Sequence, residues 1–365
     1  MKKKFQNFKK NHQNFTIFAL VILAYVLLQG LDMAGMLNHS TRNYLVPTCA
    51  YIVLAVSLNL LVGVCGELSL GHAGFMGLGA FSGIILASVL QGVVPSPMLR
   101  LLAAMVAGGV VAGVFGFLIG IPVLRLRGDY LAIVTLAFGE ILKNLINNLY
   151  VATDSRGFHM AISTEKPLLA EGGRFIVGGP LGATGIQKLS TFTAGFLLIL
   201  FTLFVVLNLI RSKEGRAIKA VRDNRIAAES VGINVTAFRM KAFVVSAFLA
   251  GMAGALFGLN YPSITASKFN FNTSINILVF VVLGGMGNIL GTIIATVGLY
   301  ILPYELNELE DYRMILYAIV LILVMLFTWS PAFKNKMAEL TLKFRKKEVG
   351  TNEWIFQKND PGSHH

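Results

Sequence analysis

Long apolar stretches alternate with short charged ones along most of the chain. A helix crosses the hydrocarbon layer of a bilayer with about 20 apolar residues, and nine apolar runs are candidates for such helices. They are residues 15–31, 44–64, 68–90, 99–124, 130–151, 189–210, 240–260, 275–302 and 312–329. The pattern predicts an all-α, polytopic membrane helical bundle, with a transmembrane domain over residues 15–330.

Basic residues gather in four of the segments that flank or connect these runs. The segments are the N-tail at 1–14, the pair Arg125 and Arg127, the loop at 211–238 and the C-tail at 331–360. Because lysine and arginine in short loops mark the cytoplasmic side of a membrane protein, we expect all four segments to be cytoplasmic. Residues 361–365 resemble the start of an expression tag, so we assign them no role in the fold or function.

One apolar run must contain a break if both termini are cytoplasmic. A single crossing per run, counted from the N-tail, would leave the C-tail outside. Run 275–302 contains the sequence Gly284-Gly285-Met286-Gly287-Asn288, which is a suitable place for the break. We therefore expect about ten membrane passes, with N- and C-termini both cytoplasmic. Whether run 275–302 spans twice or is re-entrant stays open.

Composition agrees with a lipid-embedded chain. Of its 365 residues 55% are hydrophobic and 13% are charged, and the mean hydropathy is +0.69, whereas about a quarter of the residues in a soluble domain are charged. A net charge of +13 in a soluble protein would suggest nucleic acid. Here the charge lies in short loops, which indicates membrane orientation and contact with membrane lipid, and we expect no nucleic-acid partner.

The N-terminus and the cysteines each allow one further inference. The basic N-tail before an apolar run resembles a signal peptide, but no convincing small-residue cleavage site follows, which favours an uncleaved first span. The 2 cysteines, Cys49 and Cys65, lie in or beside one run. In a helix they would be about 24 Å apart, so they cannot form a disulfide within it.

Two places along the chain resemble interrupted helices, where membrane transport proteins bind their solutes. The first is Gly66 to His72, and it offers Glu67, Ser69 and His72 as candidates for a translocation pathway. The second is the break at 284–288, with Gly285 and Asn288. The alternative is that both are turns near the membrane surface, and that His72 is only a packing residue.

Glu140 is a further pathway candidate because an ionisable residue within a span is often functional. Lys143 lies one helical turn away, so a simple pairing of the two is the alternative.

No second histidine or cysteine stands near enough to His72 in the sequence to suggest a metal site, and no pair of a nucleophile and a base suggests a catalytic site. The small residues Gly109, Gly113, Gly116, Gly120, Gly251, Gly254 and Gly258 favour close helix packing.

Two of the expected loops, at 152–188 and 211–238, suggest different roles. The segment at 152–188 is the longest expected extracytoplasmic connection, and its length suggests local structure or a docking role. Within the basic loop at 211–238, the apolar residues Ala217, Ile218, Val221, Ala228 and Val231 have helical spacing and predict a short amphipathic helix. Gly232 is its expected end, and a surface helix held by lipid headgroups is the alternative role.

Four motifs together resemble the branched-chain amino-acid ABC permease family, most closely its LivM-type subunit. They lie at 62–81, 124–141, 215–235 and 282–288, within a resemblance that covers about 44–329. The resemblance implies a partner permease of LivH type, two ABC ATPase subunits, an extracytoplasmic amino-acid-binding protein and a bacterial cytoplasmic (inner) membrane. The chain has no phosphate-binding loop of the Gly-x-x-x-x-Gly-Lys-Ser/Thr kind, so ATP and Mg would be bound by the ATPases and this chain would carry no cofactor.

ABC importer permeases touch their ATPases through a loop of pattern Glu-Ala-Ala, three residues, Gly. Ala227, Ala228 and Gly232 match this pattern, but Ile226 stands where the pattern has glutamate. The resemblance assigns the contact to residues in the loop at 211–238. The expected ATPase-coupling residues are Gly215, Arg216, Arg222, Asp223, Ala227, Ala228 and Gly232.

Three alternatives to an importer of branched-chain or other neutral amino acids remain at this point. One is an ABC permease for urea or short amides. Another is an ion-coupled secondary transporter that uses Glu67, His72 or Glu140 as its coupling group. The third is a membrane scaffold that transports nothing. The sequence identifies neither the solute nor the helices that line its route.

Overall fold

The computed structural model describes residues 2–36, 39–126, 128–154, 157–163 and 173–305, together with Ile319 and Ile322. The chain divides into two units, Met1–Ile301 and Leu302–His365, and the fold below is that of the first unit. The expected span at 312–329 lies outside the described residues except for those two isoleucines, and so do the C-tail and the tag residues.

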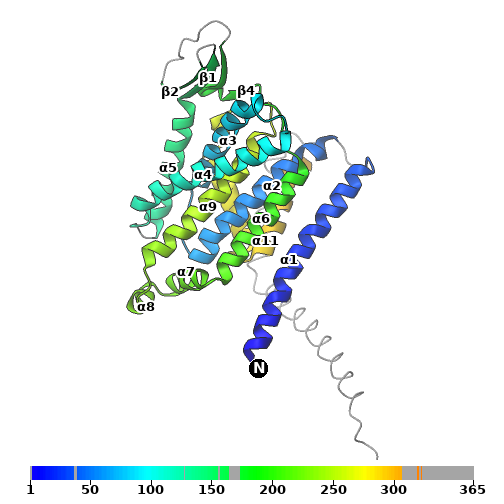
Figure 1. Cartoon of the computed structure of the whole chain (residues 1–365). Helices are drawn as coiled ribbons and strands as arrows, with labels where there is room; N and C mark the ends of the chain where they lie inside the picture. Colours follow the sequence, from blue (N-terminus) through cyan, green and yellow to red (C-terminus); the bar gives the residue numbers. More distant parts are fainter. Residues whose placement is uncertain are drawn as a thin grey trace, which may run out of the picture. The chain divides into compact units, whose positions relative to one another are not determined.

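The described part of the chain is mainly α-helical (Figure 1). Eight of its helices are long and apolar enough to cross a membrane, which confirms the all-α polytopic prediction. The α-helices are α1 (Lys2–Met33), α2 (His39–Asn59), α3 (His72–Val89), α4 (Pro97–Val123), α5 (Asp129–Asn147), α6 (Phe192–Arg211), α7 (Lys213–Asp223), α8 (Arg225–Ser230), α9 (Val235–Gly258), α10 (Phe271–Gly284) and α11 (Ile289–Glu305). The orientation of the termini and the number of passes stay predictions.

Helices α3, α4 and α9 pack against one another at the centre of the bundle. Glycines allow this approach: a Cβ at Gly79 would lie 2.1 Å from the Gly251 carbonyl oxygen, and a Cβ at Gly251 would lie 2.3 Å from that of Gly108. A Cβ at Gly254 would lie 2.0 Å from the Met76 carbonyl oxygen. The predicted close packing is therefore confirmed, because no larger residue fits at these crossings.

Both interruptions that the sequence suggested are present. The run at 68–90 is helical only from His72, and α2 continues before it as a π-helix, η1 (Leu60–Cys65). The run at 275–302 breaks where α10 ends at Gly284 and α11 begins at Ile289. Gly285 and Gly287 have φ angles of +91° and +83°, a backbone conformation that favours glycine.

A small antiparallel sheet stands at one end of the bundle (Figure 1). Its order is β2-β1-β3-β4-β5, and its strands are β1 (Leu149–Asp154), β2 (Gly157–Ile162), β3 (Arg174–Gly178), β4 (Ala183–Thr184) and β5 (Ser263–Ile264). Local structure within 152–188 was expected, but the type was not. The expected helix at 130–151 in fact ends at Asn147, and Tyr150 and Val151 are of the residue types that favour strands. Short 3₁₀-helices complete this end: η2 (Leu90–Gly92), η3 (Gly179–Leu181) and η4 (Ala266–Lys268).

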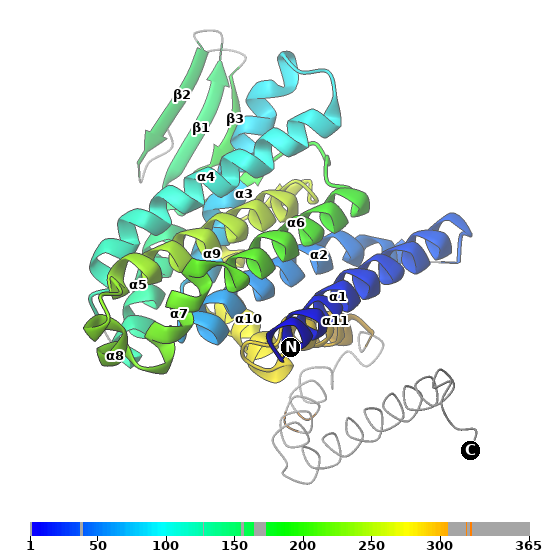
Figure 2. The ribbon, with the colours of Figure 1, turned by 60° about the horizontal axis from the view of Figure 1, so that its bottom comes forward.

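The basic loop lies at the other end of the bundle and forms two helices (Figure 2). The single amphipathic helix expected here was wrong, because Asn224 adopts an extended conformation between α7 and α8 and its side chain accepts a hydrogen bond from the Ala227 N–H. Asparagine is a favoured N-cap, so the chain starts a new helix at this residue. Gly232, with φ +82°, follows α8 as predicted for a helix end.

Candidate functional site

Arg222 connects the basic loop to the membrane-spanning part of the chain. Its guanidinium Nη1 donates a hydrogen bond to the carbonyl oxygen of Gly63 in the π-helix. The last carbonyl groups of a helix have no partner within it, and a cation there is favourable. A Cβ at Gly66 would lie 2.9 Å from Arg222 Cγ, so the arginine side chain also covers the end of the π-helix. One side chain of α7 thus contacts the first interrupted helix.

Asn59 connects that same π-helix to the break between α10 and α11. Its Oδ1 accepts a hydrogen bond from the Gly287 N–H at 2.7 Å, and its Nδ2 donates one to Thr292 Oγ1 at 2.9 Å. A Cβ at Gly63 would lie 2.0 Å from Asn59 Oδ1 and 2.2 Å from the Gly287 nitrogen. The residues Asn59, Gly63, Arg222, Gly287 and Thr292 therefore form one contact group, which we name the hinge cluster.

Glu67 forms an ion pair with Arg239, a residue in the first turns of α9. The carboxylate Oε2 lies 2.5 Å from Arg239 Nη2, with side-chain exposures of 18% and 4%. Arg239 Nη1 also donates to the Leu124 carbonyl oxygen at 3.0 Å, at the end of α4. Glu67 is therefore the counter-charge of a buried arginine. Sequence reasoning missed Arg239, although a charge within two residues of a predicted span was the available signal.

Glu140 pairs with Lys143, as the alternative for this residue predicted. The Glu140 carboxylate also accepts a hydrogen bond at 3.2 Å from the N–H of Phe271, the first residue of α10. A carboxylate at a helix N-terminus is stabilising. Glu140 thus fixes the start of α10 against α5, and this contact could not be read from the spacing of residues along the chain.

His72 is completely buried at the start of α3. Its Nε2 lies 2.8 Å from Ser57 Oγ, and Ser246 Oγ donates to the Ser57 carbonyl oxygen at 2.6 Å. Among the described residues neither His72 Nδ1 nor Ser69 Oγ has a hydrogen-bond partner, and both atoms are buried. These contacts join α2, α3 and α9 in the interior of the bundle, so His72 has a packing role whether or not it meets a solute.

The candidate pathway residues do not converge on one point. Glu67, His72 and Glu140 each have their own partners, and no hydrogen bond joins them in the part of the chain that the structure describes. Gly285 and Asn288 form the turn between α10 and α11, where the Asn288 N–H donates to the Gly285 carbonyl oxygen at 2.9 Å. Their participation in a solute route stays a prediction.

The expected coupling residues occupy different environments in α7 and α8. Gly215 is buried, and a Cβ there would lie 2.1 Å from the Leu209 carbonyl oxygen of α6. Ala228 packs with Val221 and Val235. Arg216 donates to the Arg211 carbonyl oxygen at 3.2 Å, Asp223 and Ala227 are exposed, and open space surrounds Gly232. Val231, expected on the packed face, is 75% exposed, and Ile226 is 77% exposed.

The described residues contain no group of three or more histidine, cysteine, aspartate or glutamate side chains that could hold a metal ion. Cys49 and Cys65 are both free and buried.

Residues 40–325 match the family described as branched-chain amino acid transport system / permease component. The chain belongs to this family. The LivM high-affinity branched-chain amino acid permease protein of Salmonella typhimurium is 32% identical over 346 residues, which cover 91% of this chain and 77% of that protein. The LivM protein of Escherichia coli K12 is 32% identical, with 90% and 78% covered. No solved structure shows a significant match.

A more distant relative completes the comparison. The LivH permease protein of Escherichia coli K12 is 25% identical over 247 residues, covering 67% of this chain and 77% of that protein. The family therefore includes two kinds of permease subunit, LivM and LivH, and this chain shows the higher identity to LivM. Family membership and the eight candidate spans within its described residues make the chain a multi-pass inner-membrane transport protein.

Proposed function

We propose that this chain is the LivM-type permease subunit of an ATP-driven importer of branched-chain amino acids. A LivH-type permease forms the membrane core with it, two ABC ATPases bind ATP and Mg on the cytoplasmic side, and an extracytoplasmic binding protein delivers the amino acid. The chain itself catalyses no reaction. The observation that carries this proposal, beyond family membership, is the hydrogen bond from Arg222 to the Gly63 carbonyl oxygen.

That hydrogen bond gives a route for mechanical coupling. When the ATPases close, they displace α7 and α8, and Arg222 transmits the displacement to the π-helix. Asn59 extends the contact to the turn that contains Gly287. Short π-helical segments and glycine breaks are the places where a helix changes direction most readily. A movement of the hinge cluster would therefore change the angles between α2, α10 and α11. This change would switch the permease between outward-open and inward-open arrangements.

The surface that meets the ATPases would be α8. Ile226 and Val231 are 77% and 75% exposed, and they lie outside the candidate membrane spans. An exposed apolar pair among charged residues is typical of the centre of a protein–protein interface. Buried Ala228 would hold α8 in place against α7 and α9, because it packs with Val221 and Val235.

The contacts of the acidic residues weigh against an ion-coupled secondary transporter. Glu67 is paired with Arg239 and Glu140 with Lys143, so neither is an isolated carboxylate that could bind and release a coupling ion. His72 remains, but its Nε2 is already engaged by Ser57. Force delivered from a separate motor fits these paired charges better than proton coupling within this chain.

Two experiments test the proposal. In vesicles that contain the purified subunits, leucine uptake should need ATP and the binding protein. Uptake by this chain alone without ATP would refute it, and preferred transport of urea or acetamide would change the solute class.

Crosslinking tests the coupling surface. The variant Ile226→Cys should crosslink to a lysine of a copurified ATPase through a water-soluble reagent that joins a thiol to an amine, because the native Cys49 and Cys65 are buried and do not compete. Met160→Cys, on β2 at the sheet end, is also well exposed, at 62%; it is the matched control and should not crosslink. Crosslinking at Met160→Cys in place of Ile226→Cys would place the ATPases at the wrong end of the bundle.

A further inference from the structure

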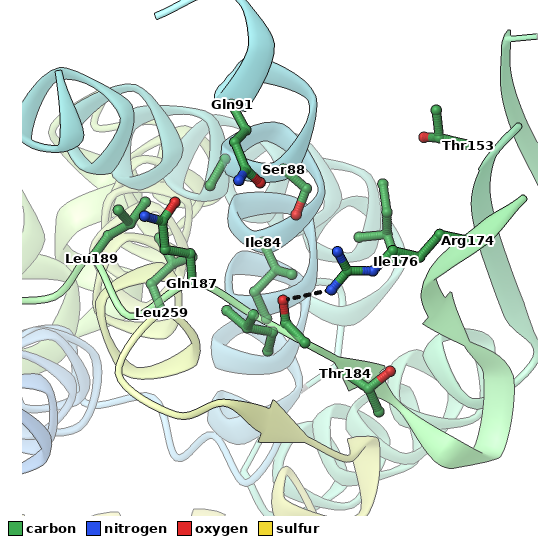
Figure 3. Close-up of a pocket in the computed structure, with 13 residues that line it drawn as sticks. Ile84, Ser88, Gln91, Thr153, Arg174, Ile176, Thr184, Gln187, Leu189 and Leu259 are labelled. Carbon is green, nitrogen blue, oxygen red and sulfur yellow. Dashed lines mark hydrogen bonds between the residues drawn. The ribbon is translucent and has the colours of Figure 1, made fainter. Parts of the chain in front are cut away.

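A pocket of about 190 Å³ lies between the end of α3 and the sheet (Figure 3). Ile84, Ala87 and Ser88 line one side from a single face of α3, and Gln91 of η2 follows directly after them. The other side is lined from the sheet and the segment that leads to α6. Its members are Thr153, Arg174, Ile176, Thr184, Gly185, Ile186, Gln187 and Leu189, with Leu259 from the end of α9. The sheet beside this pocket lies at the opposite end of the bundle from α7, the helix that carries Arg222 of the hinge cluster (Figure 1).

Arg174 is held in this pocket by the backbone of the opposite segment. Its Nη2 donates to the Gly185 carbonyl oxygen at 3.0 Å (Figure 3). A Cβ at Gly185 would lie 2.1 Å from that same nitrogen, and Gly185 has φ +66°. A larger residue here would push the end of the exposed Arg174 side chain away from this position. The segment after Gly185 is itself fixed, because the Ile186 N–H donates to the Pro262 carbonyl oxygen at 3.0 Å.

A second arginine orients the Gln187 amide. Arg100 is buried, and its Nη1 donates to Gln187 Oε1 at 3.0 Å. With its oxygen engaged, the amide presents its NH₂ group as a donor. Arg100 Nε is also buried and has no hydrogen-bond partner among the described residues. The polar wall therefore offers donors from Arg174 and Gln187, the Arg100 charge lies behind Gln187, and none of the described residues that line the pocket is acidic.

Apolar side chains lie directly beside these donors. Ile84, Ile176, Leu189 and Leu259 contribute them from four separate segments. A small ligand site typically combines an apolar surface with a few placed polar groups. A guanidinium recognises a carboxylate through its planar set of N–H donors. The combination suits a molecule that carries a carboxylate next to an aliphatic group.

We propose that this pocket is a receiving site for the transported amino acid, with Arg174 and the Gln187 amide on its carboxylate and the isoleucine and leucine side chains against its aliphatic part. The C-terminal end of α3, with Ser88 and Gln91, faces the ammonium group, because a helix C-terminus carries partial negative charge. This inference rests on the proposed function. A carboxylate from a docked binding protein has the same chemistry, but the small concave volume beside apolar residues favours the free amino acid.

The test is equilibrium binding of radiolabelled leucine to the purified permease with its copurifying subunits, without ATP and without binding protein. Saturable binding should occur, and Arg174→Gln should weaken it about tenfold or more, the effect of one lost charged hydrogen bond. Gly185→Ala should weaken it similarly by displacing the guanidinium. Leucinamide, which lacks the carboxylate, should not compete. Competition by leucinamide, or unchanged binding to Arg174→Gln, would overturn the proposal.

Two variants serve as matched controls. Lys188→Gln removes a positive charge from an exposed neighbour that does not line the pocket. Gly35→Ala imposes a comparable backbone strain, at φ +70°, where nothing lies within 4 Å. Both should bind leucine as the unaltered chain does.

Two further measurements separate the possible failures. If Arg174→Gln weakens docking of the binding protein while free leucine does not bind at all, the pocket receives a protein carboxylate and the proposal is wrong. If the unaltered complex takes up leucine with ATP and the Arg174→Gln complex does so equally well, the proposal of a receiving site is wrong, but the proposed function stands. If no ATP-dependent uptake occurs in the unaltered complex, the proposed function itself fails.

Discussion

The guanidinium of Arg239 lies 2.5 Å from the carboxylate of Glu67, and this pair joins the start of α9 to the non-helical segment before α3. Replacing Glu67 by glutamine should destabilise the protein by about 3–5 kcal/mol, because it leaves the charge of Arg239 buried without its partner. Thermal unfolding of the detergent-solubilised chain would measure this loss. The double variant Glu67→Gln/Arg239→Met should recover most of it.

An exposed ion pair provides the control for that series. Glu229 pairs with Arg225 at 2.9 Å on α8, and pairs of this kind contribute about 0.3–0.5 kcal/mol. Glu229→Gln should therefore leave the unfolding temperature nearly unchanged. Equal losses of stability in Glu67→Gln and Glu229→Gln would mean that the buried pair stabilises the fold no more than the exposed pair does.

Arg222→Gln should separate ATP hydrolysis from transport. The variant keeps α7 but loses a charged hydrogen bond to the π-helix, an interaction worth about 1.5–3 kcal/mol. We expect the ATPase rate of the assembled complex to persist, while leucine uptake per ATP falls roughly tenfold or more. Arg42→Gln, which removes an arginine from an exposed pair with Asp32, should leave both rates unchanged. Parallel loss of hydrolysis and uptake in Arg222→Gln would assign the residue to ATPase docking instead.

Asn59 should tolerate no apolar replacement. Asn59→Leu removes both the acceptor for the Gly287 N–H and the donor to Thr292, so the turn between α10 and α11 loses its contact with the π-helix. Asn59→Asp retains the acceptor and should preserve more uptake than Asn59→Leu at equal expression. Vesicle uptake of leucine measures the difference. The reverse order of the two variants would contradict a role for the Gly287 contact.

Glycine substitutions should differ sharply along the central helices. Gly254→Ala places a Cβ 2.0 Å from the Met76 carbonyl oxygen, whereas Gly113→Ala meets nothing closer than 3.6 Å. The first should lower the yield of folded chain, because backbone atoms must move apart. The second should be neutral. Monodispersity in size-exclusion chromatography reports both, and equal behaviour would mean that the crossing of α3 and α9 is adaptable.

The spans and the two interruptions could be predicted from the sequence because they depend on local properties. Apolar length decides where a helix can cross a membrane, and a cluster of glycines decides where it breaks. The pairing of Glu140 with Lys143 was also local, since the residues lie one turn apart. The division into α7 and α8 was missed because Asn224 was treated as part of one helix and not as a cap.

The remaining contacts depend on tertiary structure. Asn59 is 228 positions from Gly287 along the chain, and Arg222 is 159 positions from Gly63. No spacing rule relates such residues. The pocket beside Arg174 has the same origin, because its walls come from β1, β3, β4, α3 and the loops around them. The sheet itself was unexpected since an apolar run gave no sign that its last residues, Tyr150 and Val151, are in a strand.

The π-helix has a consequence for the inheritance of this sequence. Each hydrogen bond in Leu60–Cys65 spans one residue more than in the α-helix that precedes it. Loss of one codon in that stretch would let the remaining residues wind as an ordinary α-helix, and the chain after it would leave in nearly the same direction. Glu67 would still face Arg239. The same loss inside α9 would rotate every later residue of that helix by about 100°, so length variation among descendants of this chain should favour residues 60–65.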